Sequence, residues 1–328
     1  MREGGHKLGL HRVVEPEGAL PQAAQRLDAS GPGFDNEIVI DVETLNIDSA
    51  SFEQIVGERG KMQNPVTGSG GMLLGRVRQV GPGYEGPVEV SEGDRVATLV
   101  SLTLTPLMLD RVEKVHLDAD QVDVEATAYL WPSSPLVVMP ADLDERVALA
   151  ALDVCGAPAQ ARRLAEGADR MVVIGAGKSG MLSAAAAREC RGDDIEIFGV
   201  DRDEESLNEL RDAGLFDAVA TADATRAVEV LGRVEELTGQ QPVDVVINTC
   251  NVAGTEMSAI LPVRQRGTVY FFNMATDFAR AALGAEGVGC DAQLLIGNGY
   301  ARGHAEWTLK LVRQTPVVHR RLRRLVGV

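Results

Sequence analysis

Residues 171–180, MVVIGAGKSG, decide the fold of this chain. An apolar strand pattern runs into the spacing Gly175-x-Gly177-x-x-Gly180, and residues 178–190 then have the pattern of a helix. Gly175 permits a tight turn, Gly177 lets the backbone approach a pyrophosphate, and Gly180 lets the helix pack closely on the strand. A P-loop is excluded because its first glycine would fall on a valine at position 172. The stretch predicts a dinucleotide-binding turn, and a glycine turn of another α/β protein is the alternative.

An acidic residue ends the next strand pattern. Asp201 lies 21 residues after Gly180, where a carboxylate can accept hydrogen bonds from both hydroxyls of an adenosine ribose. It would repel a 2′-phosphate, which favours NAD over NADP, although Arg202 would bind that phosphate if it turned inward. Ser179 and Lys178 begin the helix, where N–H groups and partial positive charge suit phosphates; Lys178 is alternatively a solvent-facing residue.

From position 170 onward, strand and helix patterns alternate. The strand patterns cover residues 171–175, 194–201, 218–223, 243–250, 267–274 and 291–299, and the helix patterns cover residues 178–190, 203–214, 225–239, 254–265 and 276–287. This alternation predicts an α/β fold with a doubly wound parallel sheet. Ligands bind beyond the carboxyl ends of such strands, so Thr249, Cys250, Asn273 and Met274 are expected near the cofactor, with ordinary turn chemistry as the alternative.

The first half of the chain has a β-rich pattern. Residues 1–37 are irregular, whereas Ile38, Ile40, Val42 and Leu45 alternate with polar residues as in a half-buried strand. Residues 71–83 and 92–102 predict two further strands, and a capped helix is expected to begin near Asp142; residues 105–140 are harder to interpret. The expected domains are a small barrel or sandwich over residues 1–160, a nucleotide-binding domain over 161–298, and a C-terminal helical segment over 299–328, packed near the domain interface.

Composition limits the classes of function. The chain has 328 residues, is 45% apolar and carries a formal charge of −16, so its surface repels nucleic acid and anionic lipid. The basic cluster at Arg320, Arg321, Arg323 and Arg324 is expected to be a solvated helix face. The four cysteines have no CxxC spacing and the N-terminus has no apolar signal core, which predicts reduced thiols in a cytoplasmic protein.

The order of these parts resembles the medium-chain dehydrogenase superfamily, in which a GroES-like domain precedes a Rossmann domain. Residues 36–55, 60–77, 93–107, 150–160 and 173–182 more closely resemble the L-erythro-3,5-diaminohexanoate dehydrogenase family. The resemblance implies NAD-dependent oxidative deamination of that amino acid to 5-amino-3-oxohexanoate, ammonia and NADH in lysine fermentation. It also implies a homo-oligomer, a dimer or tetramer, with residues 267–274 or 297–300 as candidates for the pairing edge. The segment between residues 54 and 60 is shorter than the family pattern, which bears on substrate choice.

Zinc is not expected. Many medium-chain dehydrogenases hold a catalytic zinc with Cys and His ligands, and such a site needs about three protein ligands. Cys155 falls where one ligand would lie, but residues 68–70 contain no histidine and residues 46–49 no cysteine.

The catalytic candidates follow from the chemistry that the resemblance implies. Amine oxidation needs a base, and the zwitterionic substrate needs partners for a carboxylate and an ammonium group. The candidates are Asp48, Ser49, Lys61, Asn64, His304 and Glu306. Asp48 would serve as the base or as an ammonium anchor, with a turn-capping carboxylate as the alternative. Lys61 would hold the carboxylate unless it is a solvated loop lysine, and His304 would transfer protons unless it is a surface residue. The alternatives are a zinc-free NAD(P)H-dependent quinone or enoyl-type reductase of the same superfamily and a nucleotide sensor without activity.

Overall fold

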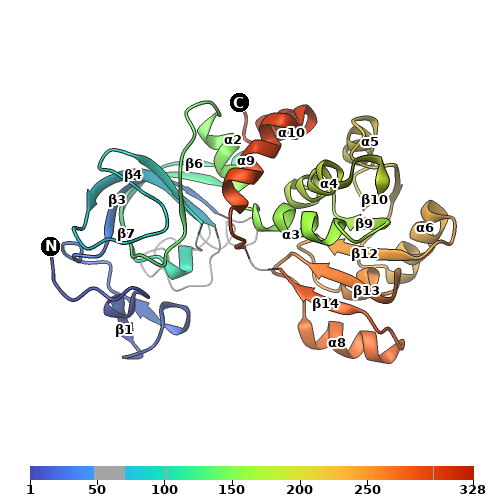
Figure 1. Ribbon diagram of the computed structural model, residues 1–328, viewed down its shortest axis with the longest axis horizontal. Helices are drawn as coiled ribbons and strands as arrows, with labels where there is room; N and C mark the ends of the chain where they lie inside the picture. Colours follow the sequence, from blue (N-terminus) through green and yellow to red (C-terminus); the bar gives the residue numbers. More distant parts are fainter. Residues whose placement is uncertain (48–70, 100–101, 298) are drawn as a thin grey trace. The chain divides into compact units, whose positions relative to one another are not determined.

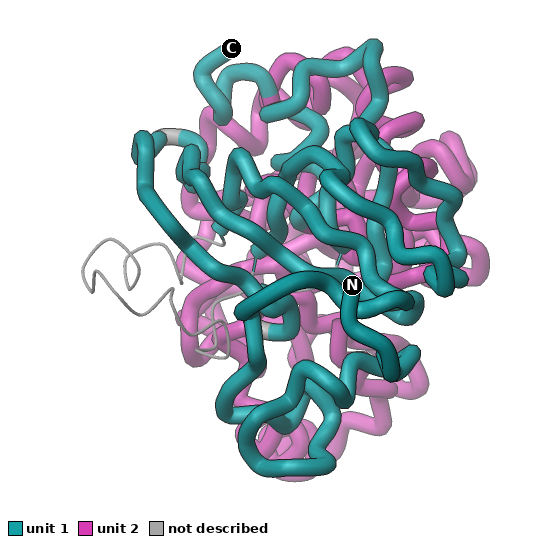
Figure 2. Tube along the Cα trace, turned by 90° about the vertical axis from the view of Figure 1, so that its left-hand side faces the viewer, with its two compact units in different colours: residues 1–153, 323–328 teal, residues 154–322 magenta. Residues whose placement is uncertain are grey.

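The computed structural model describes residues 1–47, 71–99, 102–297 and 299–328. These residues form two compact units (Figure 2). Residues 1–153 and 323–328 make up the antiparallel unit, and residues 154–322 make up the parallel unit. Each unit contains one six-stranded sheet, and a two-stranded sheet lies in the N-terminal segment (Figure 1).

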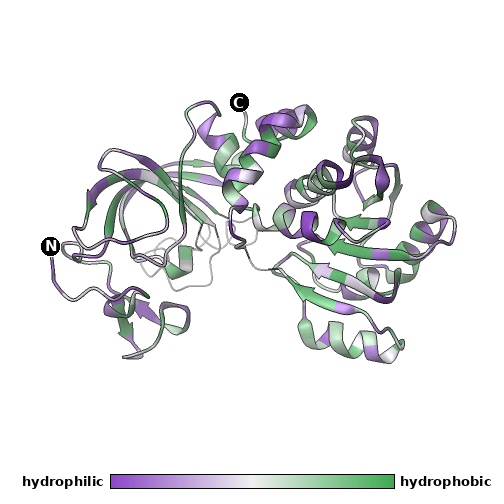
Figure 3. Ribbon diagram, in the orientation of Figure 1, coloured by the Kyte–Doolittle hydropathy of each residue, from purple (hydrophilic) through white to green (hydrophobic). Residues whose placement is uncertain are grey.

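The sheet of the parallel unit has the strand order β11-β10-β9-β12-β13-β14, and its neighbouring strands pair in parallel. The strands are β9 (Arg170–Ile174), β10 (Glu196–Asp201), β11 (Ala218–Thr221), β12 (Val243–Asn248), β13 (Val263–Phe271) and β14 (Gln293–Ile296). They are largely apolar (Figure 3), as expected for strands covered on both faces. The doubly wound parallel sheet predicted from the alternation is confirmed.

In the described part of the chain, five helices connect these strands, namely α4 (Lys178–Arg191), α5 (Glu204–Asp212), α6 (Ala227–Thr238), α7 (Glu256–Ile260) and α8 (Phe278–Gly287), and a 3₁₀ turn η6 (Gly192–Asp194) follows α4. Helix α3 (Gly156–Ala165) precedes β9, and α9 (His304–Gln314) and α10 (Pro316–Leu325) follow β14. The helix expected over residues 254–265 was too long. It ends at Ile260 because Val263 already pairs with Val243 in the sheet.

The position of β13 also corrects an expectation. Residues 267–274 were a candidate for a strand edge that pairs between subunits, but β13 lies between β12 and β14 and hydrogen-bonds to both. Among the described residues, β14 pairs with β13 alone and forms that edge of the sheet.

The sheet of the antiparallel unit has the order β6-β7-β3-β4-β5-β8. Its strands are β3 (Ile38–Asn46), β4 (Met72–Val80), β5 (Arg95–Thr98), β6 (Leu107–His116), β7 (Gln121–Leu130) and β8 (Leu136–Val138). Ile38, Ile40, Val42 and Leu45 are buried in its core, as their alternation predicted. The sheet and its buried face confirm a β-rich N-terminal part.

Short elements complete this unit. They are β1 (Val13–Glu15), β2 (Arg26–Leu27), α2 (Glu145–Leu152) and the 3₁₀ turns η1 (Leu10–Arg12), η2 (Pro21–Ala23), η4 (Leu102–Leu104) and η5 (Leu117–Ala119). Helix α2 begins two residues later than expected, because Asp144 rather than Asp142 is its N-cap. The Asp144 carboxylate accepts hydrogen bonds from the backbone N–H groups of Arg146 and Val147.

A buried ion pair holds the N-terminal segment. Arg12 and Glu37 are both fully buried, and Arg12 Nη2 lies 2.6 Å from Glu37 Oε2. Arg12 Nε donates to Glu37 Oε1 at 2.8 Å, and the guanidinium carbon lies 3.9 Å from the centre of the Tyr129 ring. His11 Nε2 lies 2.7 Å from Glu37 Oε1. The irregular segment is therefore tied to β7 by a charged cluster.

Candidate functional site

The glycine turn between β9 and α4 has three positions with different spatial constraints. Gly175 has φ of +100°, in the region that favours glycine. A Cβ atom at Gly180 would lie 1.7 Å from the carbonyl oxygen of Gly175, so the helix can approach the turn only without a side chain there. A Cβ atom at Gly177 would meet no protein atom within 4 Å. The turn is therefore closely packed at two glycines and open at the third.

Asp201, the last residue of β10, lies beside this turn. Its Oδ2 accepts a hydrogen bond from the backbone N–H of Ala176 at 2.6 Å, and its Oδ1 accepts one from the backbone N–H of Asp203 at 2.9 Å. A carboxylate oxygen can accept more than one hydrogen bond. Asp201 can therefore support the turn and still accept hydrogen bonds from sugar hydroxyls.

A cavity of about 660 Å³ opens at the carboxyl ends of the strands. It brings together six residues that the sequence assigned to the cofactor site, namely Gly175, Gly177, Asp201, Arg202, Thr249 and Cys250. The open space at Gly177, the N-terminus of α4 and the Asp201 carboxylate suit the diphosphate and the adenosine ribose of a dinucleotide. The residues present fit such a cofactor.

Other residues of the cavity were missed in the sequence. They are Ala176, Asp203, Ser206, Ala222, Asp223, Ala224, Thr225, Val252 and Arg321. Residues 222–225 follow β11, so the rule that ligands lie beyond the carboxyl ends of parallel strands would have found them. Arg321 had no such signal, because it comes from α10 at the end of the parallel unit.

Thr249 and Cys250 extend from β12 to the turn. Thr249 Oγ1 donates to the carbonyl oxygens of Ile174 and Gly175, each at 3.1 Å. Burial, and secondly the negative charge of Asp201, raise the pKa of Cys250 to about 12. Cys250 is therefore an uncharged thiol at neutral pH.

The remaining cofactor candidates do not line this cavity. Lys178 and Ser179 lie half-buried in the first turn of α4, and Gly180 is buried. Asn273 Oδ1 accepts hydrogen bonds from the backbone N–H of Ala275 and the hydroxyl of Thr276, which is turn chemistry. Met274 is 84% exposed.

Four of the catalytic candidates, Asp48, Ser49, Lys61 and Asn64, lie outside the described residues, as does the shortened segment at residues 54–60. The other two lie on α9 in the parallel unit. Glu306 is exposed. Of the six predicted catalytic residues, only His304 and Glu306 therefore lie in the described part of the chain.

His304 is not a surface residue, contrary to the alternative considered for it. It is 3% exposed, because it begins α9 with its ring facing the interior. The Tyr300 ring lies edge-on to the imidazole, with 5.0 Å between the two ring centres. Its Nε2 has no hydrogen-bond partner among the described residues. Burial lowers the pKa of His304, and the negative charge of Glu306 opposes that shift. Burial therefore favours the neutral form of the imidazole.

The basic cluster is partly buried. Arg323 and Arg324 are exposed, as expected, but the side chain of Arg321 is only 17% exposed and pairs with Glu209 of α5. The interpretation as a solvated face is therefore wrong for Arg321, because α10 packs this residue against α5.

The described residues contain no group of three or more His, Cys, Asp or Glu side chains arranged to hold a metal. Cys155 is buried next to α3, and all four cysteines, which lie in the described ranges, are free of disulfides. In the same ranges, no helix is both long enough and apolar enough to cross a membrane.

Relatives of known name match almost the whole chain. A family model described as the L-erythro-3,5-diaminohexanoate dehydrogenase N-terminal domain matches residues 11–58 and 53–140. The L-erythro-3,5-diaminohexanoate dehydrogenase of Acetoanaerobium sticklandii is 47% identical over 96% of this chain and 97% of its own length. The enzyme of the same name from Fusobacterium nucleatum is 46% identical over 96% of both chains.

Solved structures share the fold at low identity. A mycobacterial protein complexed with NADPH aligns with a TM-score of 0.57 and 20% identity, over 92% of this chain and 90% of its own. An alcohol dehydrogenase from Thermus sp. ATN1 aligns with a TM-score of 0.56 and 18% identity, over 89% of this chain and 85% of its own. These matches show the medium-chain dehydrogenase fold.

Proposed function

We propose, from the premise that this chain belongs to the L-erythro-3,5-diaminohexanoate dehydrogenase family, that it catalyses the NAD-dependent oxidative deamination of L-erythro-3,5-diaminohexanoate. The hydride of the amine-bearing carbon would pass to NAD, and a water molecule would then hydrolyse the resulting imine. The products would be 5-amino-3-oxohexanoate, ammonia, NADH and a proton. The observation that carries this proposal is the 47% identity to a relative of that name over 96% of the chain. The cavity at the glycine turn, lined by Gly175, Gly177 and Asp201, supports the dinucleotide part of it independently.

The parallel unit would hold the cofactor. Asp201 would accept hydrogen bonds from the adenosine ribose, and the N–H groups at the start of α4 would bind the diphosphate across the open space at Gly177. The bound nicotinamide would supply hydride acceptance from the amine-bearing carbon. Thr249 would keep the turn in its binding conformation through its hydrogen bonds to Ile174 and Gly175.

The protein must also remove a proton from the substrate ammonium group and bind the charged groups of the substrate. An alkyl ammonium group has a pKa near 10, so a base must accept a proton before the amine can be oxidised. We propose His304 and Asp48 as candidate bases, supported for His304 by a buried ring whose Nε2 has no partner in the described part of the chain. Lys61 would hold the substrate carboxylate, and Ser49, Asn64 and Glu306 are candidates for its remaining polar contacts.

Turnover tests the proposal directly. The purified protein is incubated with NAD and L-erythro-3,5-diaminohexanoate, and NADH absorbance and released ammonia are followed together. We expect equal amounts of both products, because one hydride and one amine leave each substrate molecule. A protein that forms neither product but reduces quinones or enones with NADPH would instead be a reductase of the same fold.

Further properties belong to the same proposal. We propose a cytoplasmic, zinc-independent enzyme of lysine fermentation that assembles as a homo-oligomer. The four cysteine thiols support a reducing compartment. The strand β14, at the edge of the parallel sheet as described, supports association through that edge.

A further inference from the structure

Arg321 reaches the cofactor cavity from α10 and is held there by α5. Its Nη1 donates to Glu209 Oε2 at 2.9 Å, and its Nη2 donates to Ser206 Oγ at 2.9 Å. The Ser206 hydroxyl in turn donates to Asp203 Oδ2 at 2.6 Å. Because Arg321, Ser206 and Asp203 line the same cavity as Asp201, this chain of contacts lies at the end of the cavity that suits the adenosine ribose.

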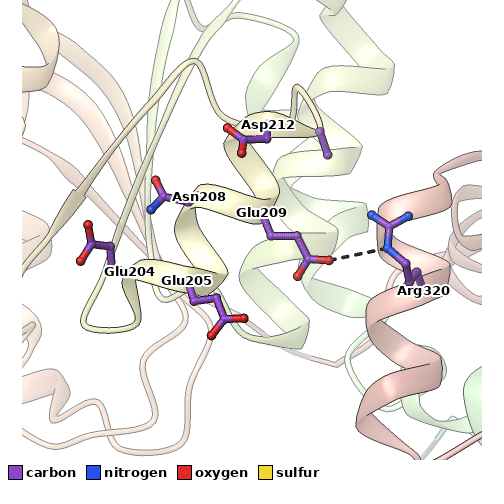
Figure 4. A pocket seen from close by; sticks show the side chains of 7 residues that line it. Glu204, Glu205, Asn208, Glu209, Asp212 and Arg320 are labelled. Atoms are coloured by element: carbon purple, nitrogen blue, oxygen red, sulfur yellow. Dashed lines mark ion pairs between the residues drawn. The ribbon is translucent and has the colours of Figure 1, made fainter.

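Glu209 balances the charge of two arginines. Its Oε2 lies 2.9 Å from Arg321 Nη1, and its Oε1 lies 3.7 Å from Arg320 Nε. Figure 4 shows the Glu209 side chain directed toward Arg320, whereas Glu204 of the same helix points away from it. The side chains of Glu209 and Arg321 are 21% and 17% exposed, so solvent screens this pair less than a fully exposed one.

The charges around the cavity decide how it receives a ribose phosphate. Asp201, Asp203 and Asp223 contribute three carboxylates, and Arg202 and Arg321 contribute two guanidinium groups. A 2′-phosphate adds about two negative charges. Both η nitrogens of Arg321 are engaged in hydrogen bonds, and the charge of Glu209 opposes its charge. The repulsion of a 2′-phosphate by the three aspartates therefore outweighs its attraction to Arg202.

We propose that Glu209 is a specificity-determining residue that holds Arg321 away from the adenosine 2′ position and so sets the preference for NAD over NADP. This inference rests on the proposed function, because it assigns a role toward the cofactor of that reaction. Asp201 would repel the 2′-phosphate by its negative charge. Glu209 would keep the Arg321 guanidinium in an ion pair, so that it does not bind this phosphate. Loss of the Glu209 charge would release Arg321 toward the phosphate.

The test measures binding, not turnover. The dissociation constants of NADH and NADPH are determined by nucleotide fluorescence for the wild type and for Glu209→Gln, and those of AMP and 2′,5′-ADP by calorimetry. We expect Glu209→Gln to tighten NADPH and 2′,5′-ADP on the order of tenfold, with NADH and AMP changed by less than about twofold. Glu205→Gln is the matched control, since it removes an equal charge from the same helix and should change none of these values.

Two further variants decide the role of Arg321. In Glu209→Gln/Arg321→Gln, the gain in NADPH affinity should disappear, and Ser206→Ala should produce a smaller gain by releasing Nη2 alone. The Ser206 variant also tests the inference if Glu209→Gln fails to fold. An equal gain in Glu205→Gln, or a gain that survives in the double variant, would overturn the inference.

The binding readout separates this inference from the proposed function. A wild type that binds NADH but does not oxidise the diamino acid would contradict the function and still allow the Glu209 comparison. A wild type with normal turnover, whose Glu209→Gln variant discriminates between NADH and NADPH as before, would contradict the inference alone.

Discussion

The carboxylate of Asp201 accepts a hydrogen bond from the backbone N–H of Ala176, with 2.6 Å between Oδ2 and the nitrogen. The acid at the end of β10 is thus joined to the glycine turn that follows β9. The two parts of the dinucleotide motif are separate in sequence but form one hydrogen-bonded unit. A change at Asp201 should therefore affect both the sugar site and the turn.

Replacement of Asp201 tests this link. In Asp201→Asn the side chain loses its charge and one of its two acceptor oxygens, so we expect NADH to bind about 10- to 100-fold more weakly, as for the loss of hydrogen bonds to a charged group. Asp193→Asn is the control, because Asp193 is fully exposed and does not line the cavity. Unchanged NADH affinity in Asp201→Asn, measured by fluorescence titration, would contradict the assignment of the ribose site.

Substitutions at Gly177 and Gly180 should affect different properties, cofactor binding in the first case and the stability of the fold in the second. Gly177→Val places a side chain where the protein has no atoms within 4 Å, and Gly177 has φ of −70°, which other residues adopt. We expect its thermal unfolding to match the wild type, with loss of NADH binding because the side chain fills the diphosphate space.

Gly180→Ala is the converse variant. Its Cβ would overlap the carbonyl oxygen of Gly175, so we expect a loss of about 1–3 kcal/mol in the free energy of unfolding, typical of overpacking. Denaturant titration measures this loss. A stable Gly180→Ala, or a Gly177→Val variant that binds NADH normally, would show that the turn does not have the proposed roles.

The buried Glu37 should make the free energy of unfolding depend on pH. Burial alone raises the pKa of Glu37, but hydrogen bonds from Arg12 and His11 outweigh it and hold the pKa at about 2, below the ordinary value of 4.5. A depressed folded-state pKa gives stability that is present above pH 4.5 and is lost as the pH falls toward 2.

We expect Glu37→Gln to lower the free energy of unfolding at neutral pH by about 3 kcal/mol, because it removes the carboxylate 2.6 Å from the buried Arg12 and leaves only Asp28, at 3.8 Å, to oppose its charge. The difference from the wild type should shrink as the pH falls, which urea titrations at several pH values would measure. Glu113→Gln, at an exposed ion pair with Arg111, should cost less than about 1 kcal/mol. A Glu37→Gln deficit independent of pH would refute the charge assignment.

The buried His304 predicts a second pH dependence, at higher pH. Its lowered folded-state pKa means that the unfolded chain binds a proton more readily, beginning near the ordinary value of 6.5. The contribution to stability is therefore full above pH 6.5 and declines as the pH falls below it. His304→Gln should remove this slope, whereas His319→Gln, at a half-exposed position of α10, should retain it. Equal slopes in both variants would rule out His304 as its source.

Zinc independence can be tested by removing metal. The motif positions for two of the usual ligands lack Cys and His, and tetrahedral zinc needs about three protein ligands. We expect dialysis against a chelator to leave the rate of NADH formation unchanged, and elemental analysis to find far less than one zinc per chain. Stoichiometric zinc whose removal abolishes activity would disprove this prediction.

Much of the parallel unit was predictable because its signals are local. Continuous apolar strands, intervening amphipathic helices and the glycine spacing each depend on neighbouring residues, and they gave the sheet class and the positions of Gly175, Gly177 and Asp201. Residues 105–140 resisted interpretation because β6 is an edge strand with mostly exposed side chains, which weakens the alternation of apolar and polar residues.

Tertiary structure alone decided the rest of the site. Arg321 meets Ser206 and Glu209 because α10 packs against α5, and no local pattern encodes a contact between residues more than a hundred positions apart. The burial of His304 likewise depends on what covers the start of α9. The amino-acid order specified a dinucleotide-binding fold through short-range periodicity, whereas the charges that surround the cofactor were set by long-range packing.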